Sequence, residues 1–412
     1  MMIRLLLISV LTLTGTAQAL QPLNPPGLLP TAIARRLLEQ DPRVAAARAG
    51  LEVAQQEAGI LDQSPYEWTT RVTGQRRTLD TGPRYGEWIA GIERTIRLPG
   101  KASADRNIGK ATIEESQAAY GEALHEAARE LMALWVDSLV AERARELAAD
   151  NLQSTQESLT AVEKRFRAGD ASKLDSSIAR AELADQRRLD NDAKTQASAA
   201  WSRLSTRFPG ITRQMMALPA PPPIVESAAL WRDRILAESD ELKVAQSRLQ
   251  KAQAMADRAH ADRIPDPTFG LHTASEIGGR ERIAGATISI PIPGGVRNSR
   301  SARAVANVEV RRHDVELTKR QLETAIASAI VTARGAYDSL QIANEGAVAT
   351  QENARLTQRA YSLGEAELQA LLLARRQATG AVTSALQAQA AALKGYYRLL
   401  VDAHLIWDLE HD

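Results

Sequence analysis

Hydrophobic and polar residues alternate along two short stretches of the chain. In residues 66–78 and 87–98 the even positions are mostly apolar and the odd positions mostly polar, and residues 283–292 repeat this pattern. Alternation with a period of two, over about ten residues per strand, is typical of strands in a membrane-spanning barrel. The pattern predicts two β-hairpins, over 66–98 and 267–292. The residues expected to face lipid are Tyr66, Trp68, Trp88, Ile92, Ile288 and Ile290.

Two long runs without proline follow these hairpins. No proline lies between Pro99 and Pro209, and none follows Pro293. Proline costs roughly 3 kcal/mol in a helix interior, so such runs favour long helices. We expect continuous helices over residues 100–168 and 296–363, each roughly 100 Å long at 1.5 Å per residue.

The remaining helical segments are shorter and interrupted. Residues 170–208 and 224–264 form one group, and residues 31–64 and 365–412 form another of similar total length. The two groups match if the N-terminal helix stacks end-on with the C-terminal helix. Each chain would then contain four rods, two continuous and two made of pieces.

The two halves of the chain share landmarks in the same order. Gly91 and Pro99 recur as Gly285 and Pro293 at the same separation, and Gly169 recurs as Gly364 at nearly that separation. We therefore expect a structural duplication. The expected organisation is a signal peptide at 1–19, a first repeat at 20–208 with its helical tip near 169, a proline-rich connector at 209–223, and a second repeat at 224–412 with its tip near 364.

The first residues resemble a secretion signal. Arg4 is basic, an apolar run extends from Leu5 to Leu13, and Ala17-Gln18-Ala19 matches a cleavage site. The apolar run is too short for a membrane-spanning helix, which needs about 20 residues. No later segment is apolar enough to span either, so we expect any membrane insertion to use strands.

The composition of the chain excludes several kinds of binding site and reaction. The chain has no cysteine, which excludes disulfides, zinc–thiolate sites and an N-terminal lipid anchor. The net charge of +1 gives no electrostatic case for nucleic acid binding. The six histidines lack the spacing of a motif such as H-E-x-x-H, and no phosphate-binding glycine loop is present. We expect no enzyme activity, no cofactor and no metal site.

Four strands cannot close a barrel, and an open sheet edge is not tolerated in a membrane. The chain must therefore oligomerise if its strands enter lipid, and three copies would supply twelve strands. The alternative is a pair of soluble hairpins, each lying on a helix.

Two strand-to-helix turns and one helical tip carry a resemblance to a known family. The turns are Leu98-Pro99-Gly100-Lys101 and the segment 290–297, and the tip is Arg165-Phe166 followed by Gly169-Asp170 and Leu174-Asp175. In this order and in duplicate they resemble the TolC-like outer membrane efflux proteins. The Pro-Gly-Lys turn is similar to that of the CzcC-like heavy-metal cation efflux branch.

The resemblance implies a mainly α protein with a small β part, which forms a trimeric duct with a twelve-stranded β-barrel and a twelve-helix α-barrel. It implies an outer membrane location extending into the periplasm. The implied partners are two further copies of the chain, outer membrane lipid, a periplasmic adaptor (membrane fusion) protein and an inner-membrane pump of the RND type. The implied adaptor-facing residues are Arg165, Phe166, Gly169, Asp170, Leu174, Asp175, Tyr361, Gly364 and Glu365.

Family members often carry a ring of aspartates after the second tip. Here the matching segment, residues 368–372, reads Leu-Gln-Ala-Leu-Leu and contains no aspartate. A carboxylate gate is therefore not expected from that segment, although Glu365 and Glu367 lie close to it in the sequence.

The resulting functional hypothesis is a passive conduit that exports small substrates, either metal cations or drugs. One alternative is the exit duct of a type I protein secretion system. An alternative from another class is a soluble periplasmic coiled-coil scaffold, which would leave the alternation in the strand regions unexplained.

Overall fold

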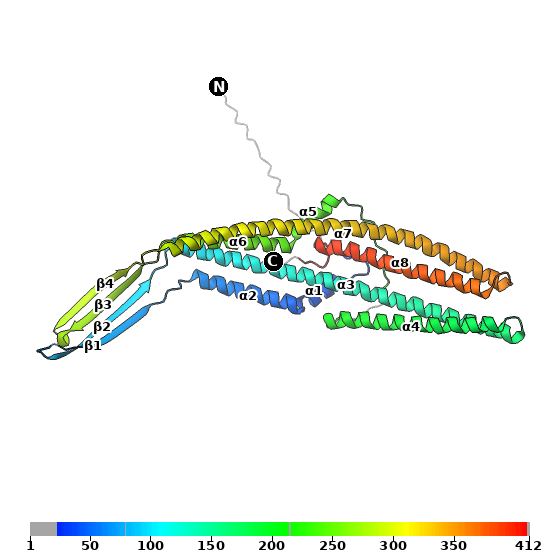
Figure 1. Ribbon diagram of the computed structural model, residues 1–412, viewed down its shortest axis with the longest axis horizontal. Helices are drawn as coiled ribbons and strands as arrows, with labels where there is room; N and C mark the ends of the chain where they lie inside the picture. The colour runs from blue at the N-terminus through cyan, green and yellow to red at the C-terminus, as the bar shows by residue number, and fades with distance from the viewer. Residues whose placement is uncertain (1–22, 79, 214–215, 410–412) are drawn as a thin grey trace, which may run out of the picture.

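The protein is an elongated body with a sheet at one end and two helical hairpins at the other (Figure 1). The computed structural model describes residues 23–78, 80–213 and 216–409. The expected signal peptide, residues 1–19, lies outside these ranges. Within them, none of the helices has the length and apolar character needed to cross a membrane.

The four strands form a single antiparallel sheet in the order β1-β2-β3-β4. The two expected hairpins are therefore joined side by side, because β2 pairs with β3. A short 3-10 helix, η1 (Ile277–Gly279), connects the last two strands. The strands are shorter than the expected hairpin ranges: β1 Thr69–Thr78, β2 Arg84–Thr95, β3 Thr268–Glu276 and β4 Glu281–Ser289.

Two continuous helices run from the sheet to the far end, as the proline-free runs predict. They are α3 (Pro99–Ala168) and α7 (Gly295–Leu363). Pro99 occupies the first position of α3, where a missing N–H costs no helical hydrogen bond. Each helix ends at a glycine with a positive φ, +87° at Gly169 and +80° at Gly364.

In the described part of the chain, six shorter helices pack along these two. Helices α2 and α4 lie along α3, whereas α6 and α8 lie along α7, and α6 also contacts α3 (Figure 1). The six helices are α1 Thr31–Glu39, α2 Pro42–Asp62, α4 Lys173–Arg207, α5 Ala228–Glu238, α6 Asp240–Ala261 and α8 Leu368–Asp402.

The expected stacking of the N-terminal helix on the C-terminal helix is wrong. The end of α4 meets the start of α2, where Arg207 forms an ion pair with Asp41. The end of α8 meets the start of α6, where His404 Nε2 lies 3.7 Å from Asp240 Oδ2. Helices α4 and α8 each fold back along the long helix that precedes them, so α4 returns along α3 and reaches the start of α2 there.

The largest apolar core lies midway along the body. Leu124, Leu131 and Trp135 of α3 are fully buried in it. The chain segments at both termini also enter this core, since the Trp135 indole donates to the Gly27 carbonyl at 2.8 Å and the Trp407 indole donates to that of Leu29 at 2.9 Å. These apolar side chains of α3 therefore serve packing, and they fix the middle of the rods.

Candidate functional site

One face of the sheet collects the apolar side chains. Residues directly opposite each other in an antiparallel sheet share a face. The register places Ile92 opposite Leu271, and Leu271 opposite Ala286. In the next row on this face, Val72 lies opposite Ala90. The large apolar side chains of this face and of its margins are exposed in the single chain: Trp68, Val72, Trp88, Ile92, Phe269, Leu271, Ile288 and Ile290.

Strand β3 was the weakest part of the sequence pattern. Apolar and polar residues alternate poorly over 268–275. Pairing decides their orientation, since Phe269 lies opposite both Arg94 and Ile288. Phe269 and Leu271 therefore extend the apolar face across the joint between the two hairpins.

The opposite face carries an internally paired polar network beside one apolar row, formed by Ile89, Ala274 and Ile283. The Glu87 carboxylate is only 4% exposed. It accepts a hydrogen bond from Gln75 Nε2 at 2.8 Å and pairs with Arg77 Nε at 2.8 Å. Arg77 also reaches Glu276 Oε2 at 2.9 Å, so this network links three strands.

Arg94 and Tyr66 lie at the edge of the apolar face, and both make polar contacts there. The Arg94 guanidinium lies 5.4 Å from the Trp68 ring centroid, and its Nε donates to the Tyr66 carbonyl at 3.2 Å. Tyr66 precedes β1, and its hydroxyl donates to Asp266 Oδ2 at 2.8 Å. Tyr66 is therefore part of the junction between sheet and helices and lies outside the strand in which it was expected.

A buried lysine lies at this junction. Lys101, in the first turn of α3, is 2% exposed, and its Nζ lies 3.0 Å from Asp266 Oδ2 and 3.2 Å from Asp262 Oδ1. Asp266 Oδ1 accepts a hydrogen bond from the Leu98 N–H at 3.0 Å. Burial alone would raise the pKa of the Asp266 carboxyl, but these hydrogen bonds outweigh burial and lower its pKa below the usual value. Asp266 is therefore ionised and joins the turn to the helix.

A second carboxylate extends this network to the neighbouring helices. Asp105 pairs with Arg97 at 3.0 Å and with Arg258 of α6 at 2.6 Å. Arg97 also donates to the Leu61 and Asp62 carbonyls at the end of α2, each at 2.7 Å. The junction therefore fastens both hairpins to three helices. Sequence reasoning did not identify this cluster. The sequence feature that could have indicated it is the spacing of charged residues at 97, 101 and 105, four positions apart.

The two helical tips have closely similar turns. The N–H groups of Gly169 and Asp170 donate to carbonyls of the last turn of α3, at 3.1 and 2.8 Å. Gly364 and Glu365 do the same at the end of α7, at 3.1 and 2.9 Å. A Cβ atom at either glycine would contact nothing within 4 Å. The positive φ, not a lack of space, is what favours glycine at these positions.

The first tip also has a capping box. The Ser172 hydroxyl accepts from the Asp175 N–H, and the Asp175 carboxylate accepts from the Ser172 N–H, both at 3.0 Å. This reciprocal pair satisfies two free donors at the start of α4. Asp175 thus has a structural task, whereas Asp170 is exposed in the turn itself.

The two tips pack against each other within one chain. The Arg165 guanidinium lies 5.2 Å from the Tyr361 ring centroid. A small apolar cluster joins the tips below this contact, formed by Val162, Ala179, Leu368, Leu371 and Leu372. The segment after the second tip, which lacks the family aspartates, is therefore used for packing between hairpins. Phe166 and Leu174 remain exposed, at 41% and 62%.

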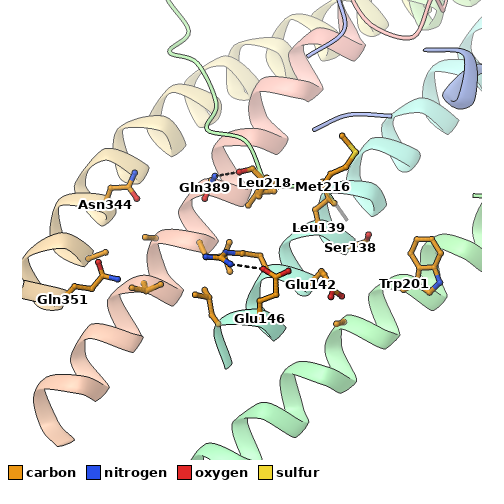
Figure 2. Close-up of a pocket in the computed structure, with 18 of the residues that line it drawn as sticks. Ser138, Leu139, Glu142, Glu146, Trp201, Met216, Leu218, Asn344, Gln351 and Gln389 are labelled. Atoms are coloured by element: carbon orange, nitrogen blue, oxygen red, sulfur yellow. Dashed lines mark hydrogen bonds and ion pairs between the residues drawn. The ribbon is translucent and has the colours of Figure 1, made fainter. Parts of the chain in front are cut away.

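An open pocket of about 710 Å³ lies midway along the helices. Figure 2 shows Glu142 and Glu146 of α3 on one side of it and Asn344 and Gln351 of α7 on the other. Glu142 pairs with Arg145 at 2.6 Å, and hydrogen bonding to that guanidinium lowers the pKa of the Glu142 carboxyl. The Glu142 carboxylate is therefore already paired with an arginine, and we assign it a structural role.

Comparison with known proteins identifies the family. The outer membrane efflux protein family matches residues 33–207 and 231–400, which is most of the chain. No curated protein sequence was found to match it. The fold is shared with the Campylobacter jejuni CmeC outer membrane channel, at 15% identity and a TM-score of 0.71, over 92% of this chain and 86% of that one.

Two further channels show the same fold. The outer membrane protein VceC of Vibrio cholerae has 15% identity and a TM-score of 0.72, over 90% of this chain and 95% of that one. The open-state MtrE outer membrane channel of Neisseria gonorrhoeae has 18% identity and a TM-score of 0.64, over 92% and 90%. The chain belongs to the outer membrane efflux protein family, whose members are outer membrane transport proteins and not enzymes.

Proposed function

We propose that this protein forms the outer membrane duct of a tripartite efflux pump and exports small substrates passively. The observation that carries the proposal is the sheet, because one face collects exposed large apolar side chains and the other carries an internally paired polar network. A soluble scaffold would leave that apolar face uncovered by any described element. A lipid bilayer covers such a face, and alternating strands suit it.

The sheet also has two unpaired edges, β1 and β4. Strand edges in a membrane must be paired, because the hydrocarbon region offers no water to their N–H and C=O groups. Pairing β1 of one copy with β4 of the next closes a ring without changing the chain. Three copies give the twelve strands of the proposed barrel, and their helices continue it as a twelve-helix tube.

In this assembly the polar face lines the lumen. The paired side chains of Glu87, Arg77 and Glu276 would then border the aqueous path, while Trp68 and Trp88 would lie toward lipid. Aromatic side chains are enriched at the membrane interface, which suits Trp68 at the margin of β1.

We assign the helical tips to docking of a periplasmic adaptor, which connects the duct to an inner-membrane pump of the RND type. The tips lie at the end of the body farthest from the sheet (Figure 1). Phe166 and Leu174 supply exposed apolar side chains there, flanked by the exposed Asp170 and Glu365. Gly169 and Gly364 set the turn geometry that presents them.

The two-repeat organisation supports the same assignment. We infer that 20–208 and 224–412 are duplicated units, because the described part of each contains two strands, one long helix and three shorter helices. The connector between them passes over α8, where Gln389 Nε2 donates to the Leu218 and Pro219 carbonyls. Duplication gives each chain two similar tips.

The cargo is proposed as metal cations or drugs. A related alternative is the exit duct of a type I protein secretion system, which would use the same barrel with a different pump. Deleting the gene separates them: efflux predicts increased sensitivity to metals or drugs, whereas secretion predicts loss of an exported protein with unchanged sensitivity.

Assembly is tested by fractionating membranes and measuring the native mass of the detergent-extracted protein. The proposal expects an outer membrane protein with three times the mass of one chain. Because the chain has no cysteine, single cysteines introduced along β1 and β4 report edge pairing without background. Cross-links between copies from β1 to β4, and none from cysteines on β2, support the closed ring. A monomer that stays in solution without detergent would overturn the proposed closed ring.

A further inference from the structure

Two buried histidines meet a buried carboxylate where α8 ends and α6 begins. His404 Nε2 lies 3.2 Å from His125 Nδ1 and 3.7 Å from Asp240 Oδ2. One potential ligand atom from each residue lies within 4.8 Å of the others. His125 and Asp240 are 4% and 1% exposed, so the cluster is shielded from water. Its members come from three different segments: α3, α6 and the chain after α8.

The carboxylate of this cluster has an unused oxygen. Asp240 Oδ1 lies 3.3 Å from Lys243 Nζ, but Oδ2 is buried and has no hydrogen-bond partner among the described residues. A carboxylate in the first turn of a helix is explained by the helix dipole. The dipole does not explain two imidazole rings placed beside its buried oxygen. Buried polar atoms are normally satisfied, so Oδ2 indicates a missing partner.

The equivalent joint of the first repeat is built differently. Where α4 ends and α2 begins, Arg207 pairs with the buried Asp41 and also reaches Glu130 of α3. A protein cation therefore neutralises that joint. In the second repeat two imidazoles occupy the corresponding place.

A second carboxylate lies beside each histidine, at hydrogen-bond distance for His125 and farther away for His404. His125 Nε2 lies 3.2 Å from Asp402 Oδ1, and Asp402 is itself bound by Arg129 Nε at 2.7 Å. His404 Nδ1 lies 3.9 Å from Glu238 Oε2. Metal-binding histidines usually donate their second N–H to such an oxygen, which fixes the tautomer and turns the other nitrogen toward the ion. Here the contact with Asp402 directs His125 Nδ1 into the cluster, where it faces His404 Nε2.

His404 also occupies a costly backbone position. Its φ is +51°, and it follows the last residues of α8 where the Leu405 N–H closes the turn on the Leu400 carbonyl at 2.9 Å. The two tip turns use glycine for the same conformation. A non-glycine residue with positive φ is uncommon and tends to mark a site where the side chain is needed.

We propose that His125, His404 and Asp240 bind one divalent transition-metal ion, with Zn²⁺ the best match. Two imidazoles and one carboxylate are a usual zinc ligand set, with bond lengths of about 2.0–2.2 Å and water in a fourth position. Ligands at those lengths in a tetrahedron lie roughly 3.4 Å apart, close to the 3.2 and 3.7 Å separations found here. The ion fastens the joint of the interrupted rod α8–α6 onto α3.

The test uses the full-length, detergent-solubilised protein without a histidine tag, stripped with a chelator. Equilibrium dialysis against micromolar ZnCl₂, followed by elemental analysis, should find one zinc per chain. His125→Gln and His404→Gln should each weaken binding by more than the 10–100-fold typical of losing a group that only hydrogen-bonds to a metal ligand. His260→Gln and His313→Gln, at exposed positions on α6 and α7, are the matched controls and should bind like the wild type.

X-ray absorption at the zinc edge of the wild-type protein provides a readout that needs no variant. It should show nitrogen and oxygen ligands at about 2.0–2.1 Å with the outer-shell signature of imidazole. The proposal is overturned if the stripped protein takes up no zinc, since the two imidazoles then only contact each other and Asp240. It is equally overturned if zinc binds without imidazole ligands, or if the control variants lose it as the ligand variants do.

Discussion

Placing a lysine on each face of β1 tests the orientation of the sheet directly. Val72 lies on the apolar face, 73% exposed in the single chain, and its row continues across β2 through Ala90. The adjacent Thr73 points to the polar face and lies opposite Ile89. Val72→Lys and Thr73→Lys therefore introduce the same charge at nearly the same depth, on opposite faces.

The expected loss of stability depends on how far the new lysine lies from the middle of the bilayer. A strand rises about 3.4 Å per residue, so with a tilt of about 40° each residue advances roughly 2.6 Å along the membrane normal. Val72 is within two residues of the middle of β1, which places it roughly 4 Å from the midplane. A lysine there should destabilise the inserted protein by about 2–4 kcal/mol, near the full midplane cost. Ile288→Lys, near the end of β4, should cost roughly 1 kcal/mol, since the penalty falls toward the interface.

The assay is folding into lipid vesicles, followed by urea titration and by the gel-mobility shift between folded and unfolded protein. Thr73→Lys should fold like the wild type, because its lysine reaches water in the lumen. Equal losses of stability for Val72→Lys and Thr73→Lys would refute the assignment of one face to lipid and the other to the lumen. A larger loss for Thr73→Lys would show that the sheet is oriented the other way.

Three further predictions concern the tips and the junction. Gly169→Leu should cost about 1–2 kcal/mol at the turn through its positive φ, and it should reduce efflux in a resistance assay while the trimer still forms; normal efflux would contradict the docking role. Leu371→Ala should destabilise the tip contact by about 2–5 kcal/mol, measured as faster hydrogen exchange at both tips, whereas Leu373→Ala, at an exposed position, should have little effect. The lowered pKa of Asp266 predicts a junction stabilisation that is present above the ordinary carboxyl pKa and is lost as the pH falls through the lowered value; thermal melting of Asp266→Asn should lose that acid dependence, and an unchanged melting profile would argue against it.

The sequence was sufficient for the elements whose signal is local. Proline-free runs located α3 and α7 to within a residue or two, and the glycines at 169 and 364 located their ends, because a positive φ restricts the residue type strongly. Alternation placed Trp88 and Ile92 on one face, because side chains in a strand point to opposite sides in turn.

Contacts between distant segments were decided by the tertiary structure. The pairing of β2 with β3 oriented Phe269, whose own strand alternates weakly. Helices α4 and α8 return along the long helices that precede them, so α4 meets α2 and α8 meets α6. The segment lengths alone predict instead that the N-terminal helix stacks on the C-terminal helix. The same return brought His404 beside His125, although the sequence spacing of these residues resembles no metal motif.

The physical reason for this division is the range of the interactions involved. Helix termination and strand alternation depend on the dihedral angles of a few neighbouring residues, so they can be read from the sequence. Ion pairs and ligand clusters such as Lys101 with Asp266, or His125 with His404, depend on which surfaces pack together. That packing is chosen by burial summed over whole helices, and no single stretch of the chain encodes it.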